Sequence, residues 1–190
     1  MMQTRSFAAD FRAAGDDVAP VIEGYFSVFN SNYEIGRGLS ESIDEHAFDG
    51  ALDDDIRALV NHNTTLVLGR TKANTLTLTV DGHGLFGRVS INPKDTDAMN
   101  CYERVRRGDV SQCSFGFDIT REDTEVREDG SVHWTIMGVK LYEVSVCTFP
   151  AYEETGVTAR SDEAARLRQR ASEAWAARML AKIGKGEENA

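Results

Sequence analysis

A hairpin signature in residues 75–91 constrains the fold more strongly than any other segment of the chain. Residues 75–80 read TLTLTV, and such strict alternation is typical of a strand with one buried face. The pair Asp81-Gly82 follows, which suits a tight turn, and residues 85–91 (LFGRVSI) supply a second strand. We therefore expect an antiparallel sheet around this hairpin.

Further segments are strand-like and end in turn residues. They are VIEGYFSVF (21–29), IRALVNH (56–62), VSQCSFGFDIT (110–120) and VHWTIMGVKLYEVSVCTF (132–149). Many short strands with a few helices predict a mainly β fold with flanking helices, in the α+β class. The arrangement that we expect is a closed or nearly closed antiparallel β-barrel.

Three helices are expected beside these strands. Asp95 is a suitable N-cap for a helix that ends at Arg107, with Gly108 just after its C-terminus. A second, short helix is expected over residues 44–52. Residues 161–183 predict an amphipathic C-terminal helix. Its apolar side chains recur at steps of four: Leu167, Ala171, Trp175, Met179 and Ile183.

The charge distribution separates the C-terminal helix from the rest of the chain. The net charge is −10, and residues 160–190 hold seven Lys/Arg and five Asp/Glu, a net +2, so residues 1–159 carry −12. We expect residues 1–159 to form one domain and residues 160–190 a helical tail. The acidic balance argues against a nucleic-acid partner, and it also serves solubility.

Composition excludes several other classes of protein. No window approaches the roughly 18 uninterrupted apolar residues of a membrane span, and the N-terminus lacks the apolar core of a secretory signal. The three cysteines are odd in number and lack metal-ligand spacing, which favours a reducing cytosol over a disulfide framework. The four histidines form no pair with such spacing, so no metal and no cofactor is expected.

The segment QCSFGF (112–117) places a serine beside a glycine on one face of a predicted strand. Alternation puts Ser114 and Gly116 on the face opposite to Cys113 and Phe115. Gly116 leaves room for a substrate backbone beside Ser114, whereas a thiol on the apolar face is normally inert. From the pattern alone, Ser114 is either an exposed strand residue or a nucleophile.

Glu143 and His62 are the candidate partners of that serine. Glu143 lies in the apolar segment LYEVSV, where an unpaired carboxylate is costly, and either histidine or arginine would be a suitable partner. His62 ends an apolar run between two asparagines, and Ser145 is a rival nucleophile on the face of Glu143. A base, a hydroxyl and an acid form the residue set of a serine hydrolase.

Taken together, several stretches of the chain resemble the prohead maturation proteases of tailed bacteriophages, a serine peptidase family related in fold to the herpesvirus assemblins. The stretches are GYFSVFN (24–30), ESIDEHAFDGAL (41–52), ALVNHNTTLVLGR (58–70), GLFGRVSI (84–91), RRGDVSQCSFGF (106–117) and LYEVSVCTFPAY (141–152). The resemblance implies His62 as general base, Ser114 as nucleophile and Glu143 as third member of the triad. Asn63 departs from the family pattern, which often has Asn-His-Asp at this place.

The resemblance also implies an assemblin-like fold and a function. The expected activity is that of a serine endopeptidase of procapsid maturation, acting in the host cytoplasm inside the assembling procapsid. Its expected substrates are the scaffolding segment of the major capsid protein or a scaffold protein, and the protease itself, with self-association as a further expectation. The alternatives are a non-enzymatic capsid assembly or scaffold component and a hydrolase of another class, although the G-x-S-x-G elbow of esterases is absent.

Overall fold

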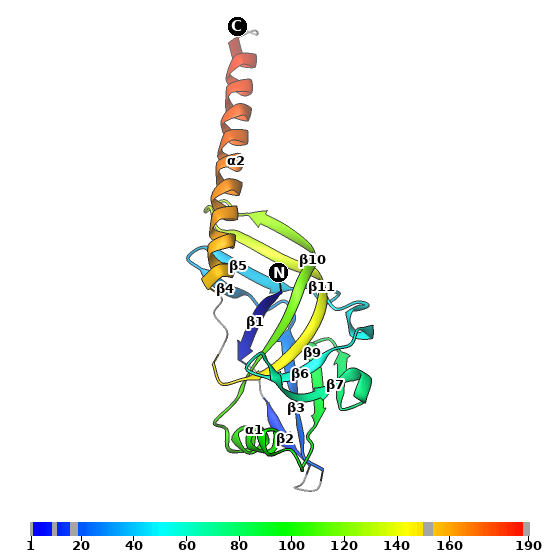
Figure 1. Ribbon diagram of the computed structural model, residues 1–190. Coiled ribbons are helices and arrows are strands. Elements are labelled where there is room, and N and C mark those ends of the chain that lie inside the picture. Colours follow the sequence, from blue (N-terminus) through cyan, green and yellow to red (C-terminus); the bar gives the residue numbers. More distant parts are fainter. Residues whose placement is uncertain (1, 9–10, 16–18, 150–153, 188–190) are drawn as a thin grey trace. The chain divides into compact units, whose positions relative to one another are not determined.

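The protein is built mainly from β-strands. The computed structural model describes residues 2–8, 11–15, 19–149 and 154–187, and these residues form two β-sheets and two α-helices (Figure 1). The mainly β, α+β class expected from the sequence is therefore confirmed. The described helices include none that is long and apolar enough to cross a membrane.

The larger sheet carries the residues of interest. Its path of hydrogen-bonded neighbours is β1-β10-β11-β5-β4, and β6 joins it by pairing with both β11 and β7. The strands are β1 (Gln3–Ala8), β4 (Tyr33–Gly36), β5 (Leu39–Ile43), β6 (Arg57–Val60), β7 (Asn63–Arg70), β10 (Gln112–Val126) and β11 (Val132–Cys147). The pairing of β6 with β11 is parallel, so this sheet is mixed rather than antiparallel throughout.

The smaller sheet contains the hairpin that was expected from residues 75–91. Its order is β2-β3-β9-β8, and its pairs are antiparallel. The strands are β2 (Arg12–Ala14), β3 (Val21–Val28), β8 (Leu76–Val80) and β9 (Gly84–Ser90). Val80 pairs with Leu85 at the turn, and the Asp81 side chain accepts hydrogen bonds from the backbone of His83 and Gly84.

Neither sheet closes on itself in the part of the chain that is described, so the expected barrel is not confirmed. The pairing path of one sheet ends at β1 and β4, and that of the other ends at β2 and β8. Alternation in sequence predicts that strands exist, but closure depends on which edges meet. That choice is made by contacts between residues far apart in the chain.

Two compact units divide the described residues. The first, comprising 1–31, 42–123 and 135–153, has an apolar core beneath β10 and β11. Phe115 and Phe117 stack in this core with ring centroids 4.6 Å apart, and Phe48 packs edge-on against Phe115. The apolar face predicted for Cys113 and Phe115 is therefore confirmed.

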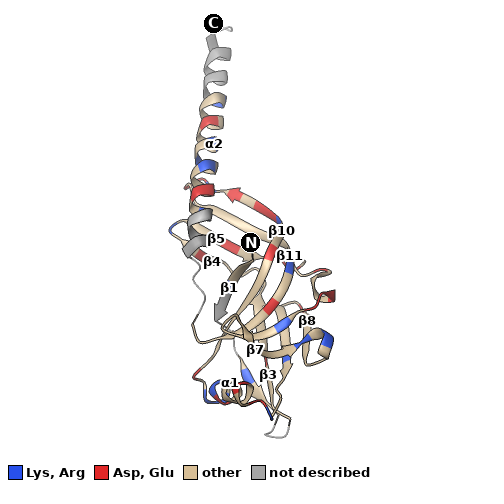
Figure 2. Cartoon of the chain, in the orientation of Figure 1, with Lys and Arg blue, Asp and Glu red and all other residues tan. Residues whose placement is uncertain are grey.

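The second unit comprises residues 32–41, 124–134 and 154–190 and includes α2 (Glu154–Glu187). Its small core gathers Leu39, Val132, Trp134 and Ala164, with Leu167 packed against it. Acidic and basic side chains are interspersed along the described part of α2 (Figure 2). The C-terminal helix predicted over 161–183 is confirmed and begins earlier.

The apolar stripe predicted for this helix is only partly covered. Leu167 contacts the small core, whereas Trp175 is 62% exposed. The side chains of Met179 and Ile183 lie outside the described residues.

Helix α1 (Thr96–Arg107) has the predicted ends. The Asp95 carboxylate accepts hydrogen bonds from the backbone of Asp97 and Ala98, and Gly108 takes a left-handed conformation after the last turn. The short helix expected over 44–52 is wrong, because turns occupy most of this segment and only Ala51–Asp53 forms a 3-10 turn. Gly50, with φ 74°, interrupts any continuous helix there.

Candidate active site

His62 is presented by a tight turn between β6 and β7. The two-residue loop Asn61-His62 connects paired residues Val60 and Asn63, and both loop residues have positive φ, 49° and 58°. Left-handed φ at both central positions is the conformation of a type I′ hairpin turn, which asparagine tolerates well. Residues 56–62, expected to be one strand, therefore end as a strand at Val60.

This turn is fastened to β11 by hydrogen bonds. The Asn61 backbone N–H donates to the Val146 carbonyl over 3.0 Å, and the Asn61 side-chain oxygen accepts from the Thr148 backbone N–H over 2.9 Å. The His62 backbone N–H donates to the Ser145 hydroxyl over 3.2 Å. These hydrogen bonds stabilise the left-handed backbone conformation of His62, which is unfavourable for a residue other than glycine.

Glu143 is the partner of the His62 side chain. The Nδ1 and Oε1 atoms lie 2.7 Å apart, and the side chains are 20% and 5% exposed, respectively. In the parallel pairing of β11 with β6, Glu143 is opposite Arg57, the first residue of β6, and Val146 is opposite Val60, the last residue before the His62 turn. Because a carboxylate accepts, Nδ1 carries the proton in this contact and Nε2 is left for other chemistry.

Ser145 completes the surroundings of the carboxylate. Its hydroxyl is fully buried and donates to the second oxygen of Glu143 over 2.5 Å. The same oxygen atom of Ser145 accepts the backbone N–H of His62. The sequence placed Ser145 on the face of Glu143 but offered it only as a rival nucleophile. The signal for this second role is the Glu-x-Ser spacing, which puts both side chains on one face of a strand.

The pKa of His62 is perturbed by its surroundings. Burial disfavours the charged imidazole, but hydrogen bonds to Cys147 and Glu143 and the charge of the carboxylate outweigh it and raise the pKa to about 10. Cys147 Sγ lies 3.9 Å from Nε2. Glu143 Oε1 is closer to the imidazole, 2.7 Å from Nδ1, so the direction of the shift rests mainly on Glu143.

Ser114 lies on β10 with its side chain fully buried. Its hydroxyl donates to the backbone carbonyl of Arg5 over 2.9 Å, across the pairing of β1 with β10. In the described structure the hydroxyl therefore points to β1 and is not joined to His62. Ser114 is therefore not an exposed strand residue, because it is fully buried at this position of β10.

Gly116 connects the Ser114 strand to the acid–base pair. A Cβ atom at Gly116 would lie within 2.4 Å of Glu143 Oε1, so any larger residue would displace the carboxylate. By alternation, Ser114 is on the same face of β10 as this close approach. The structure thus brings His62 and Glu143 into contact and puts Ser114 on the adjoining strand, two residues from the glycine.

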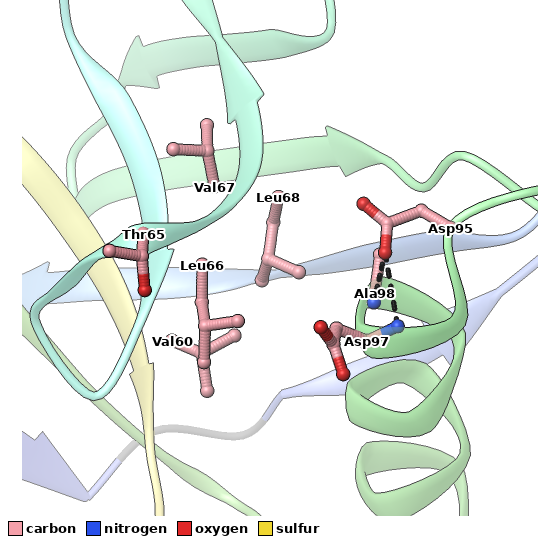
Figure 3. Close-up of a pocket in the computed structure, with 8 residues that line it drawn as sticks. All are labelled: Val60, Thr65, Leu66, Val67, Leu68, Asp95, Asp97 and Ala98. Atoms are coloured by element: carbon pink, nitrogen blue, oxygen red, sulfur yellow. Dashed lines mark hydrogen bonds between the residues drawn. The ribbon is translucent and has the colours of Figure 1, made fainter.

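Two hollows flank the β6–β7 hairpin. One of about 250 Å³ is next to the acid–base pair and is lined by Met2, Arg57, Leu59, His62, Thr64, Val67, Tyr142 and Glu143. A smaller one of about 140 Å³ lies between β7 and the start of α1 (Figure 3). In the smaller hollow, the Asp95 carboxylate caps helix α1 by accepting hydrogen bonds from the backbone of Asp97 and Ala98, which is a structural role.

The other histidines are accounted for elsewhere. His46 lies exposed near Glu45 and Asp49, His83 packs edge-on against Tyr25, and His133 contacts the Ser40 hydroxyl. All three cysteines are free and buried. Within the described residues, no group of three or more His, Cys, Asp or Glu side chains could hold a metal ion.

Comparisons with known proteins indicate the family of the chain. The family model described as caudovirus prohead serine protease matches residues 7–170. The chain is 30% identical over 164 residues to the prohead protease of Enterobacteria phage HK97, covering 84% of this chain and 68% of that protein. No solved structure gives a significant match. On both the extent of the family match and the identity to a member, this chain belongs to the caudovirus prohead serine proteases.

Proposed function

We propose that the protein is a serine endopeptidase of phage procapsid maturation that uses Ser114, His62 and Glu143. The observation that carries the proposal is the 2.7 Å contact between His62 and a buried Glu143, whose strand β11 is the neighbour of β10, the strand of Ser114. Membership in the prohead protease family supports the biological setting. Residues 1–159 form the protease domain and residues 160–190 its helical tail.

The proposed chemistry is acyl transfer through a covalent intermediate. Neutral His62 takes the proton of the Ser114 hydroxyl at Nε2 while Oγ attacks the scissile carbonyl carbon. The protonated imidazole is stabilised by the Glu143 carboxylate and then gives its proton to the leaving amine. Water hydrolyses the resulting ester on Ser114, with His62 acting as base again.

Glu143 and Ser145 have supporting roles in this scheme. Glu143 holds the Nδ1 proton, so that Nε2 stays available as the base. Ser145 is a positioning residue, because its one hydroxyl links the second carboxylate oxygen to the backbone of the His62 turn. In this scheme, the Ser145 hydroxyl takes no part in the acyl transfer itself.

The proposed substrates are the scaffolding segment of the major capsid protein or a separate scaffold protein, and the protease itself. The proposed place of action is the assembling procapsid in the host cell. A serine peptidase should react with a serine-directed phosphonate. The alternative, a non-enzymatic assembly or scaffold component, should not react.

Co-expression with the capsid protein of the same phage tests the assignment. Ser114→Ala and His62→Ala should each lose about a million-fold in kcat, and the double variant should be no worse, because members of a triad act as a unit. Capsid-protein cleavage is read by mass spectrometry. Exposed Ser90→Ala and His46→Ala are the matched controls and should cut normally. Full cleavage by Ser114→Ala would overturn the proposal.

A further inference from the structure

Strand β1 lies along the edge of β10 directly across the proposed nucleophile. It pairs antiparallel from Gln3 opposite Phe117 to Ala8 opposite Gln112, with Ser6 opposite Ser114. β1 ends the pairing path of the sheet, so without it β10 would be the edge strand (Figure 1). An edge strand with unpaired backbone groups accepts an extended peptide as an added strand.

The pairing engages the nucleophile itself. The Ser114 hydroxyl donates its single proton to the Arg5 carbonyl, and Arg5 and Ser114 are both buried. A hydroxyl that donates to Arg5 cannot at the same time donate to His62 Nε2. The described arrangement is therefore a closed state in which the proposed first step of catalysis is blocked.

The same segment also reaches the hollow beside the acid–base pair. Met2 lines the 250 Å³ pocket together with His62 and Glu143. An extended chain thus runs across the serine with a backbone carbonyl on its hydroxyl and an apolar side chain in the adjoining pocket. Backbone pairing along a strand edge and a side chain in an adjoining pocket are the contacts by which an extended peptide binds as an added strand.

The docking of β1 on β10 includes an unfavourable contribution. The Arg5 guanidinium donates hydrogen bonds within β1, to Gln3 and to the carbonyl of Thr4. The Thr4 hydroxyl is buried without a hydrogen-bond partner among the described residues, which opposes docking. Across the pair, the Arg5 guanidinium lies 5.8 Å from the Phe117 ring centroid, a modest attraction.

We infer that the edge of β10 over Gln112–Phe117 is the docking surface for an extended peptide substrate, and that the segment Met2–Ala8 occupies it as an internal competitor. This inference rests on Ser114 being the nucleophile. Substrate binds by displacing the segment and adding a strand in its place. Substrates that carry an apolar side chain at the position equivalent to Met2 fit the pocket best.

The test compares the labelling rate of Ser114 by a fluorophosphonate in the full chain and in a variant that lacks residues 1–8. The truncated variant should react about tenfold faster or more, because reactivity scales with the fraction of molecules in which β1 is displaced. Added peptide QTRSFA, the sequence of β1, should slow the labelling, and a scrambled peptide should not. Equal rates in the two proteins would overturn the inference.

A point substitution covers the case in which the truncated chain does not fold. Ser6→Pro removes a backbone N–H and disturbs strand pairing opposite Ser114, whereas Ser6→Ala keeps the backbone intact. The proline variant should label faster than the wild-type protein and the alanine variant at the wild-type rate. If neither the full chain nor any released variant is labelled at Ser114, the nucleophile assignment itself is wrong. Labelling at one common rate refutes only the role of β1.

Discussion

Glu143 and Glu41 are both buried carboxylates on neighbouring strands of one sheet, yet their partners give them different uses. Glu41 is 2% exposed and accepts from the Arg160 guanidinium over 2.9 Å, and the same guanidinium lies over the Trp134 ring. Glu143 is likewise buried, and its carboxylate contacts His62. Arginine remains charged at every accessible pH, whereas histidine can gain or lose its proton.

The comparison shows that burial of a carboxylate is not in itself a sign of catalysis. A pair whose charges are fixed can only stabilise or specify a structure, and even that gain is offset by desolvation. A pair with a titratable partner can move a proton. The sequence left arginine and histidine open as partners of Glu143, and the protein uses one of each type at two separate places.

The largest expected effect separates the two carboxylates in catalysis. Glu143→Gln should lower kcat by about ten-thousand-fold, because the amide no longer selects the tautomer with a free Nε2. Glu41→Gln is the matched control and should cleave the capsid protein at temperatures at which it is folded. If both variants lose the same amount of activity when folded, the partner of the carboxylate does not determine its role in catalysis.

The next effect separates them in stability. Arg160→Met leaves Glu41 buried without its cation, which should lower the free energy of unfolding by about 3–5 kcal/mol in urea titrations. Adding Glu41→Leu to Arg160→Met should recover most of this loss, since an apolar pair can replace a buried ion pair. The corresponding double replacement of Glu143 and His62 should restore no activity.

A smaller effect concerns the hydroxyl behind Glu143. Ser145→Ala removes the donor to the second carboxylate oxygen, a loss of about 1–3 kcal/mol for a buried charged group, or roughly ten- to a hundredfold in kcat. The apparent pKa of the activity profile should move while KM stays constant, which a purely structural role would not produce. Ser27→Ala is the control, because this fully buried serine hydroxyl has no partner among the described residues.

The smallest effect is on the pH profile. The pKa of His62 is raised from the unperturbed histidine value to about 10 in the folded protein, so activity should rise as pH increases towards about 10. Stability should run in the opposite direction. The gain from the protonated pair is fully present below the unfolded pKa and is lost as pH rises through the folded pKa. A cleavage rate that is constant from pH 6 to 9 would contradict a histidine base, and Glu143→Gln should shift the rise to lower pH.

Much of the fold could be predicted from local patterns. The strands with clear alternation, β3, β8, β9, β10 and β11, lie close to the predicted ranges, and α1 has the predicted cap residues. β1 has the sequence QTRSFA, which shows no apolar alternation and so does not indicate a strand. Its strand conformation depends on pairing with residues more than 100 positions away. The pattern of residues 56–62 predicts one strand and does not indicate β7, because the hairpin turn at Asn61-His62 carries no glycine or proline.

The site shows the same limit. Alternation placed Ser114 with Gly116 and Glu143 with Ser145, and the structure keeps both pairs on their faces. No local pattern could indicate that Arg5 would accept the Ser114 proton or that Cys147 would lie near Nε2. Those neighbours are set by strand order and register, which depend on long-range pairing.

The parallel pairing of β6 with β11 has a consequence for timing. His62 and Glu143 are 81 residues apart in the chain, and their contact needs the two strands to be side by side. Glu143 is synthesised after both His62 and Ser114, so the acid–base pair cannot form until β11 has left the ribosome and paired with β6. Any peptidase activity that needs this pair therefore begins only late in the folding of the chain.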